Sequence, residues 1–283
     1  MIVVLICLIA LAYGSYTDIK TREIPDTLSI GMIFLGFAIA IGITIASWSY
    51  KPLLASLVGF VVCVLIGIAF YYTGQWGGGD AKVLMGLGSL IGINVFMLNQ
   101  GIPELGLFFI NLILFGAFYG IVWLLSLAII NWHLFRPAFR EARRNAKMIR
   151  LRIIFLGLVV LFTLFVLILK PDFMISIIVY LILLFAVISL YLFLLIKTVE
   201  KTCLLKKIKI SKLTEGDWVV EKVNMKNANK FIYTKIGITA KGIKMLKSSG
   251  KKNILVKEGI PFVPNFLIAY IATLAIGNWI PVF

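Results

Sequence analysis

Long apolar runs alternate with short polar stretches along this chain of 283 residues. A helix that crosses a bilayer needs about 20 mainly apolar residues, and eight runs reach or approach that length. These runs cover residues 1–16, 27–47, 52–72, 82–98, 105–132, 153–169, 173–196 and 262–280. The pattern predicts an all-α polytopic membrane protein with about eight transmembrane helices.

One long polar stretch, residues 197–260, interrupts this pattern before the last apolar run. Short apolar runs and turn residues within it predict a small α+β domain. Strands are expected at Leu205–Ile210, Trp218–Val223, Phe231–Thr234 and Asn253–Lys257. Ala240–Lys247 is expected to form a short helix with Thr239 as its N-cap.

The apolar and polar stretches together divide the chain into five expected parts. They are a membrane core at 1–132, a basic loop at 133–152, two further transmembrane helices within 153–196, the α+β domain at 197–260, and a C-terminal transmembrane helix at 261–283.

Composition supports a membrane protein and suggests its orientation. The chain is 61% hydrophobic, with a mean hydropathy of +1.04. If the N-terminus lies outside, 26 of the 28 Lys and Arg residues fall on the inner side, and only Lys51 and Lys170 lie outside. Because basic residues concentrate in cytoplasmic loops, this division predicts that both termini are outside and that 133–152 and 197–260 are cytoplasmic.

The same charge bears on partners. A net charge of +16 gathered on the cytoplasmic face predicts contact with anionic lipid headgroups. The basic residues accompany no recognisable nucleic-acid motif, so nucleic acid is not expected as a partner. Cys7, Cys63 and Cys203 are widely separated and His133 is the single histidine, so no zinc set is expected.

Two acids stand out at the edges of apolar runs. Asp18 follows the first run, and Asp80 precedes the fourth, directly after Gly77, Gly78 and Gly79. Two membrane crossings separate them, so both acids are expected on the same, cytoplasmic face. The three glycines are free to adopt φ > 0 and would let an extended substrate backbone lie against the loop.

Two neighbouring carboxyl groups can share one proton, because both cannot ionise cheaply together. The ionised group can take a proton from a water molecule as that water attacks a peptide carbonyl. The protonated group can donate to the carbonyl oxygen and later to the leaving amine. This pair is therefore typical of an aspartic-type peptidase.

Plainer interpretations stay open beside this one. The glycines can form a flexible turn with Asp80 as a helix-capping residue. Asp18 can form an interfacial ion pair with Lys20 or Arg22. Glu23 and Asp26, in the same expected loop, are expected to be solvated and without a role in chemistry.

The residues Asp18 and Gly77-Gly78-Gly79-Asp80, about sixty positions apart, resemble the motif of the GxGD membrane aspartyl peptidases. More narrowly, residues 1–130 resemble the archaeal preflagellin and prepilin peptidases. The segment Lys257–Pro264 is similar to a region before the last helix of archaeal members.

This resemblance implies that Asp18 and Asp80 are the catalytic pair and that no metal or cofactor takes part. It implies a multi-pass protein of the cell membrane that removes short basic leaders from archaellin or type IV pilin-like precursors carrying class III signal peptides. The tetra-cysteine zinc segment of the bacterial branch, which accompanies N-methylation, does not occur here, so peptidase activity alone is expected.

Two alternatives were weighed against this function. A presenilin-like or signal-peptide-peptidase-like intramembrane protease shares the GxGD motif, but its Pro-Ala-Leu motif does not occur in this sequence. A transporter or membrane scaffold could use a glycine-broken helix, but transporter sites lie near the bilayer midplane and accompany repeated halves. Neither feature is visible in this chain.

Overall fold

The computed structural model describes residues 1–96, 101–169, 172–221, 232 and 237–277. The chain divides into two compact units. One comprises Met1–Ile121 together with Ile208–Phe283, and the other comprises Val122–Lys207.

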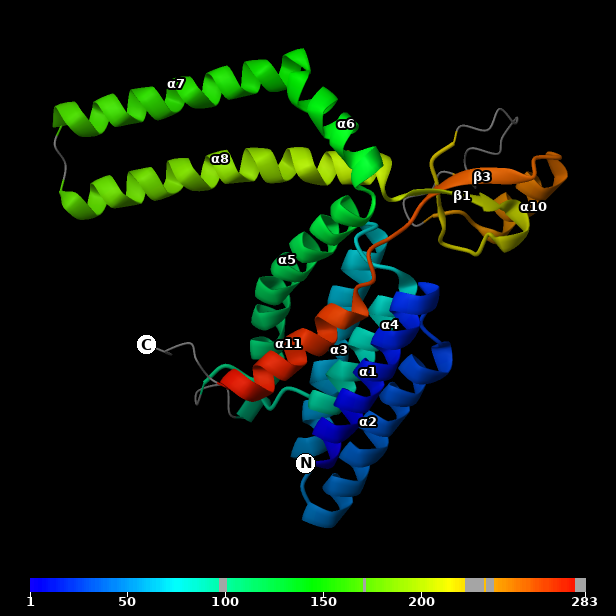
Figure 1. Ribbon diagram of the computed structural model, residues 1–283. Coiled ribbons are helices and arrows are strands. Elements are labelled where there is room, and N and C mark those ends of the chain that lie inside the picture. The colour runs from blue at the N-terminus through cyan, green and yellow to red at the C-terminus, as the bar shows by residue number, and fades with distance from the viewer. Residues whose placement is uncertain (97–100, 170–171, 222–231, 233–236, 278–283) are drawn as a thin grey trace. The chain divides into compact units, whose positions relative to one another are not determined.

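The first unit contains the N-terminal membrane helices and the last helix (Figure 1). Its helices in chain order are α1 (Ile2–Thr21), α2 (Asp26–Ser47), α3 (Lys51–Tyr72), α4 (Gly78–Ile91), most of α5 (Glu104–Ile130), and α11 (Val263–Ile276). Across both units, six described helices are long and apolar enough to cross a membrane: α1, α2, α3, α5, α7 (Ala146–Leu169) and α8 (Phe173–Thr202). The predicted multi-pass helical membrane fold is thereby confirmed.

Helices α4 and α11 are shorter than the apolar runs 82–98 and 262–280 predicted. Each has 14 residues, and each ends at a glycine with positive φ: Gly92 at 69° and Gly277 at 59°. Glycine adopts a positive φ readily, because it has no Cβ that opposes this conformation, and a residue with positive φ commonly ends a helix. Apolar sequence alone therefore overestimated the length of both helices.

Helix α4 packs tightly against α2 and α3 through small residues. A Cβ on Gly88 would lie 2.5 Å from the carbonyl oxygen of Gly59, so the two backbones are in direct contact. Ser56 Oγ on α3 donates a hydrogen bond of 2.7 Å to the carbonyl of Ser89. Small residues permit such close approach between membrane helices, where van der Waals packing is the main attraction.

The first turn of α4 packs beside the last turns of α3. A Cβ on Gly67 would lie 3.3 Å from the Cβ of Ala81, and a Cβ on Gly78 would lie 3.7 Å from Tyr71 Cε2. Helix α3 continues beyond Gly67 to Tyr72.

Helix α11 packs along α1 and is tied to α5 by buried amides. Asn265 Nδ2 donates to the carbonyl of Leu112 at 3.3 Å, and Asn111 Nδ2 donates to Thr273 Oγ1 at 3.0 Å. Both asparagines are fully buried. These bonds attach the last helix to the N-terminal ones across more than 150 residues of sequence.

Helix α1 runs further than the apolar run 1–16 predicted. It continues to Thr21 and ends at Arg22, whose φ is 61° and whose N–H donates to the carbonyl of Asp18 at 3.0 Å. Asp18 therefore lies inside the last turn of the helix. Pro25 precedes α2 with extended backbone, as expected for a proline that marks the loop.

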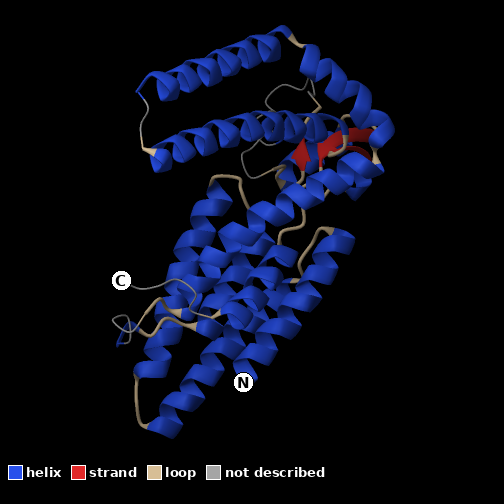
Figure 2. Cartoon of the chain, turned by 60° about the vertical axis from the view of Figure 1, so that its left-hand side comes forward, coloured by secondary structure: helices blue, strands red, loops and turns tan. Residues whose placement is uncertain are grey.

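Residues 205–257 form the small α+β domain that the sequence predicted, with its strands drawn in red in Figure 2. Its elements are β1 (Leu205–Lys209), the 3-10 turn η2 (Ile210–Lys212), β2 (Trp218–Val219), α10 (Ala240–Ser248) and β3 (Asn253–Lys257). The strand order is β1-β3-β2, and β2 pairs antiparallel with β3.

Local details of this domain agree with the prediction. Thr239 caps α10 by accepting the N–H of Gly242 at 3.2 Å. Ile243 and Leu246 of α10 join Ile254 in its buried core. The strand expected at Phe231–Thr234 falls outside the described residues, except for Ile232.

The second unit contains the end of α5, then α6 (Trp132–Arg144), α7 and α8. Helices α7 and α8 lie side by side and run antiparallel (Figures 1 and 2). The expected basic loop at 133–152 is helical instead, since α6 and the first turns of α7 occupy it. Trp132, Phe135 and Phe139 recur at helical spacing on one face of α6, and α6 packs on α8.

Candidate active site

Asp18 is a buried carboxyl group at the C-terminal turn of α1. Only 6% of the residue is exposed. Its Oδ2 accepts a hydrogen bond of 3.0 Å from the backbone N–H of Val263, the first residue of α11. A backbone N–H donor stabilises a carboxylate, so the start of α11 supports the ionised form of Asp18.

The basic neighbours of Asp18 along the chain have other partners. Lys20 Nζ lies 3.0 Å from the hydroxyl of Tyr16, and Arg22 Nε lies 3.7 Å from Glu258 Oε1. The carboxyl group of Asp18 is thus held by a backbone donor, and the charge of Arg22 also acts on it. Asp18 links α1 to the segment that leads into α11.

Asp80 lies in the first turn of α4, outside the six helices that are long enough to span a membrane. Its Oδ2 accepts the N–H of Gly77 at 3.0 Å, so it caps its own helix. Burial and, after it, the charge of Asp18 raise the pKa of Asp80 to about 7, against the opposite effect of the Gly77 N–H. The fold thus brings the two acids within electrostatic range of each other.

The three glycines before Asp80 do not use positive φ, which was one expected reason for their presence. Among the described residues with positive φ, the glycines include Gly74 and Gly92 but none of the three at 77–79. Gly79 instead permits close packing, because a Cβ there would lie 2.9 Å from Ile24 Cδ1. Gly79 therefore lets the start of α4 approach the loop that follows α1. Asp18 lies in the last turn of α1, and Asp80 lies directly after Gly79.

An aromatic cluster lies beside the acids. Trp76, in the loop before Asp80, stacks on Phe70 with ring centroids 4.4 Å apart. It also contacts Phe262 at 5.2 Å and Phe266 at 5.6 Å, both from the segment that binds Asp18. These rings connect the α3–α4 loop, which precedes Asp80, to the start of α11, which binds Asp18.

Sequence reasoning missed two groups at this site. One is the backbone N–H of Val263, and the other is Tyr119 on α5, whose hydroxyl donates to the carbonyl of Pro261 at 3.0 Å. Tyr119 thereby holds the chain two residues before Val263. The sequence feature that could have indicated these groups is the pair Pro261 and Pro264, because proline restricts the backbone that leads into the last helix.

Two further acids, Glu23 and Asp26, lie in the loop after α1 and at the start of α2. Asp26 is exposed and forms an ion pair of 2.6 Å with Lys82 in the first turns of α4. Glu23 is exposed. Exposed ion pairs such as that of Asp26 contribute little to stability. Glu23 and Asp26 are therefore suitable control positions for Asp18 and Asp80.

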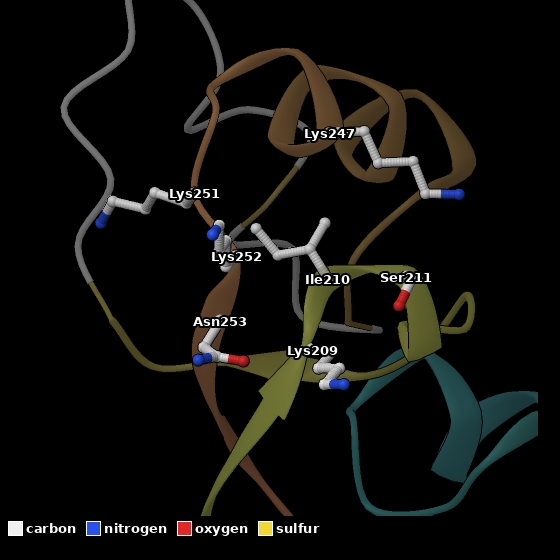
Figure 3. Close-up of a pocket in the computed structure, with 7 residues that line it drawn as sticks. All are labelled: Lys209, Ile210, Ser211, Lys247, Lys251, Lys252 and Asn253. Atoms are coloured by element: carbon white, nitrogen blue, oxygen red, sulfur yellow. The ribbon is translucent and has the colours of Figure 1, made fainter.

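A separate hollow lies on the small α+β domain and carries no acid. Its volume is about 470 Å³, and it is lined by Lys209, Ile210, Ser211, Lys247, Lys251, Lys252 and Asn253 (Figure 3). The ammonium groups of Lys247 and Lys251 extend to opposite sides in Figure 3, and Lys251 is paired with Glu221. These lysines do not converge on one point.

No group of three or more His, Cys, Asp or Glu side chains lies together in the part of the chain that the structure describes. The candidate site holds two carboxyl groups. Each accepts a backbone N–H, from Val263 for Asp18 and from Gly77 for Asp80, and the pKa of Asp80 is raised to about 7. Such a pair can activate water and protonate a leaving group.

Comparison with known proteins gives a match over the N-terminal part of the chain. Residues 5–133 match the type IV leader peptidase family, and this stretch contains both acids and the three glycines. The resemblance inferred from the sequence is confirmed over these residues.

Three similar relatives are each named preflagellin peptidase. The relative from Methanococcus voltae is 34% identical over 37% of this chain and 45% of its own length. The one from Methanococcus maripaludis is 37% identical over 32% of this chain and 39% of its own length. The one from Methanocaldococcus jannaschii is 37% identical over 29% of this chain and 35% of its own length. The chain matches less than half the length of each relative.

Proposed function

We propose that this chain, whose residues 5–133 match the type IV leader peptidase family, is a membrane endopeptidase of the aspartic type. Its substrates are archaellin or type IV pilin-like precursors with class III signal peptides, from which it removes the short basic leader. The observation that carries the proposal is the pairing of Asp18 and Asp80 at the ends of two helices, inside the matched stretch. The names of the three relatives support the same substrate class.

The orientation in this proposal places both acids at the cytoplasmic boundary of the membrane. Its support is the charge distribution, in which 26 of 28 Lys and Arg residues would lie inside. A basic leader approaching from the cytoplasm would then meet the acids where the following apolar helix of the precursor enters the lipid.

In the proposed mechanism Asp18 is the ionised base and Asp80 is the protonated acid. The N–H of Val263 supports a carboxylate at Asp18, and the raised pKa of Asp80 favours its protonated form near neutrality. Asp18 takes a proton from water as the oxygen of that water attacks the scissile carbonyl carbon. Asp80 donates its proton to the carbonyl oxygen, and a proton then reaches the leaving amine as the C–N bond breaks.

Gly77, Gly78 and Gly79 are proposed to contact the substrate backbone. Gly77 is exposed, while Gly78 and Gly79 are partly exposed. Without side chains they leave room for an extended peptide beside Asp80. No metal or cofactor is part of the proposal.

The deciding experiment compares acid-to-amide variants in membranes at equal protein level, with a purified archaellin precursor as substrate. Asp18→Asn and Asp80→Asn keep the size of each side chain but remove the titrating group. Each should reduce cleavage by about 10²-fold or more, because acid–base assistance contributes about 10²–10⁴ and paired groups act as a unit. Cleavage products are resolved by mass.

Glu23→Gln and Asp26→Asn are the matched controls, and both should retain most of the activity. Near wild-type cleavage by Asp18→Asn and Asp80→Asn would refute the aspartic mechanism. A wild-type protein that inserts correctly but cleaves no precursor would favour the transporter or scaffold alternative.

A further inference from the structure

An apolar groove lies between α7 and α8, inside the second unit of the chain. Its volume is about 250 Å³. It is lined by Arg152, Phe155, Leu156 and Val159 of α7 and by Val187, Leu190 and Tyr191 of α8. Both helices are long and apolar enough to span a bilayer, so in a membrane this groove faces lipid.

Among the described residues that line the groove, Arg152 is the charged one. Its guanidinium carbon lies 5.6 Å from the ring centroid of Tyr191, so the charged group rests over that ring. Arg152 Nε and Nη2 are buried, and among the described residues neither nitrogen has a hydrogen-bond partner. A buried guanidinium N–H without an acceptor is costly, which indicates that an acceptor from outside the described chain completes this site.

The position of Arg152 suits a lipid headgroup. It lies in the second turn of α7 and is the seventh residue of that helix, which begins at Ala146. The preceding helix α6 joins two spans, α5 and α7, through the single residues Asn131 and Asn145. Because α6 is too polar and too short to cross a bilayer, it lies along the membrane surface, and Arg152 lies just beneath that surface.

Positive charge dominates this part of the surface. Arg143, Arg144, Lys147 and Arg150 are all exposed, and Glu141 is the single acid of residues 133–152. Clusters of basic residues beside a membrane helix attract anionic lipids electrostatically. This charge favours an anionic headgroup over a zwitterionic one of similar size.

We propose that the groove between α7 and α8 binds an anionic phospholipid. Its phosphate oxygens accept hydrogen bonds from Arg152 Nε and Nη2, and an acyl chain lies along the apolar residues of the groove. The planar guanidinium presents these two donors side by side, in the geometry that a phosphate group accepts. Tyr191 covers one face of the guanidinium, 5.6 Å from its central carbon. The site is independent of the two acids of the first unit.

The test is native mass spectrometry of the full chain, delipidated in detergent and titrated with dioleoyl phosphatidylglycerol or dioleoyl phosphatidylcholine. We expect one retained phosphatidylglycerol molecule, bound at least several-fold more tightly than phosphatidylcholine. Arg152→Gln should weaken this binding by about tenfold, the order expected for losing hydrogen bonds to a charged group. Arg150→Gln removes the same charge from an exposed position of the same helix and should leave most of the binding.

A second pair of variants tests the groove without touching the arginine. Leu190→Trp fills the groove and should release the lipid, while Ile188→Trp, on an exposed position of α8, should not. Equal binding by the wild type and Arg152→Gln, or equal affinity for the two lipids, would overturn the proposal. If Arg152→Gln fails to insert, retention of the lipid by Leu190→Trp would overturn it.

Discussion

Two carboxyl groups with different surroundings make up the candidate site, and their difference sets the expected roles. Asp18 is buried and receives a backbone N–H from another helix, whereas Asp80 caps its own helix and has a raised pKa. Under the proposed function, these surroundings favour Asp18 as the base and Asp80 as the acid.

The first prediction is a loss of activity in alkali. Asp80 must be protonated to donate, and its pKa is raised to about 7, so cleavage should fall as the pH rises through about 7. The measurement is the initial rate of precursor cleavage against pH, at saturating and at low substrate. Glu23→Gln should show the same fall, and a rate that keeps rising above neutral pH would exclude Asp80 as the acid.

Tyr119 is predicted to act as a positioning residue. Its hydroxyl holds the carbonyl of Pro261, and Val263, two residues on, donates to Asp18. Tyr119→Phe should lower kcat about 2- to 10-fold, as expected for a lost hydrogen bond of ordinary strength, with little change in KM. Tyr72→Phe, an exposed tyrosine at the end of α3, is the control. An unchanged kcat in Tyr119→Phe would remove it from the site.

Sequence reasoning selected the two candidate acids but not the groups that hold them. Asp18 and Asp80 were visible because an acid at the edge of an apolar run is costly and therefore conspicuous. The Val263 N–H was not visible, because a backbone donor is present at every residue other than proline, and this one lies 245 positions from Asp18. Only the three-dimensional fold distinguishes it.

At the scale of elements, α4 depends on contact between backbones. A Cβ on Gly88 would lie 2.5 Å from the Gly59 carbonyl oxygen and 2.7 Å from Cys63 Cβ, so a side chain there must displace α3. The apolar pattern predicted both helices but not this contact, because a glycine in an apolar run does not reveal what packs against it. The first turn of α4 carries Asp80, so its packing also bears on the site.

Gly88→Ala should therefore destabilise the protein by about 1–3 kcal/mol, the usual cost of overpacking a core. The matched control is Gly42→Ala on α2, where a Cβ meets nothing within 4 Å and improved helix propensity should leave stability equal or slightly higher. Thermal unfolding in detergent measures both. Equal melting temperatures for the two variants would contradict the close contact.

The helix α6 shows why one element was predicted wrongly. Many basic residues suggested a loop at 133–152, but aromatic residues at Trp132, Phe135 and Phe139 have helical spacing. The helix forms even with Pro137 inside it, and it packs against α8. Hydrophobic periodicity was therefore the better guide in this stretch, even though its average hydrophobicity is low.

At the scale of the whole molecule, the orientation in the membrane can be tested directly. The three native cysteines are buried, so a membrane-impermeant thiol reagent has little background. Arg143→Cys should resist labelling from outside the cell and react after the membrane is opened. Lys51→Cys, in the turn expected outside, should label in intact cells. Strong external labelling at position 143 would reverse the orientation and with it the cytoplasmic position of the acids.

Under the proposed function, the level of Asp80 along α3 constrains the shape of a substrate. Ala81, the residue after Asp80, lies beside Gly67, and the five further residues of α3 extend about 8 Å past that level at 1.5 Å per residue. A precursor cut at Asp80 must therefore present its peptide bond below the end of α3. At that depth a chain in lipid is helical, because its backbone groups have no water to bond. The scissile carbonyl is then engaged with an N–H four residues further on, so under the proposed function about one turn of the precursor has to unwind before water can attack.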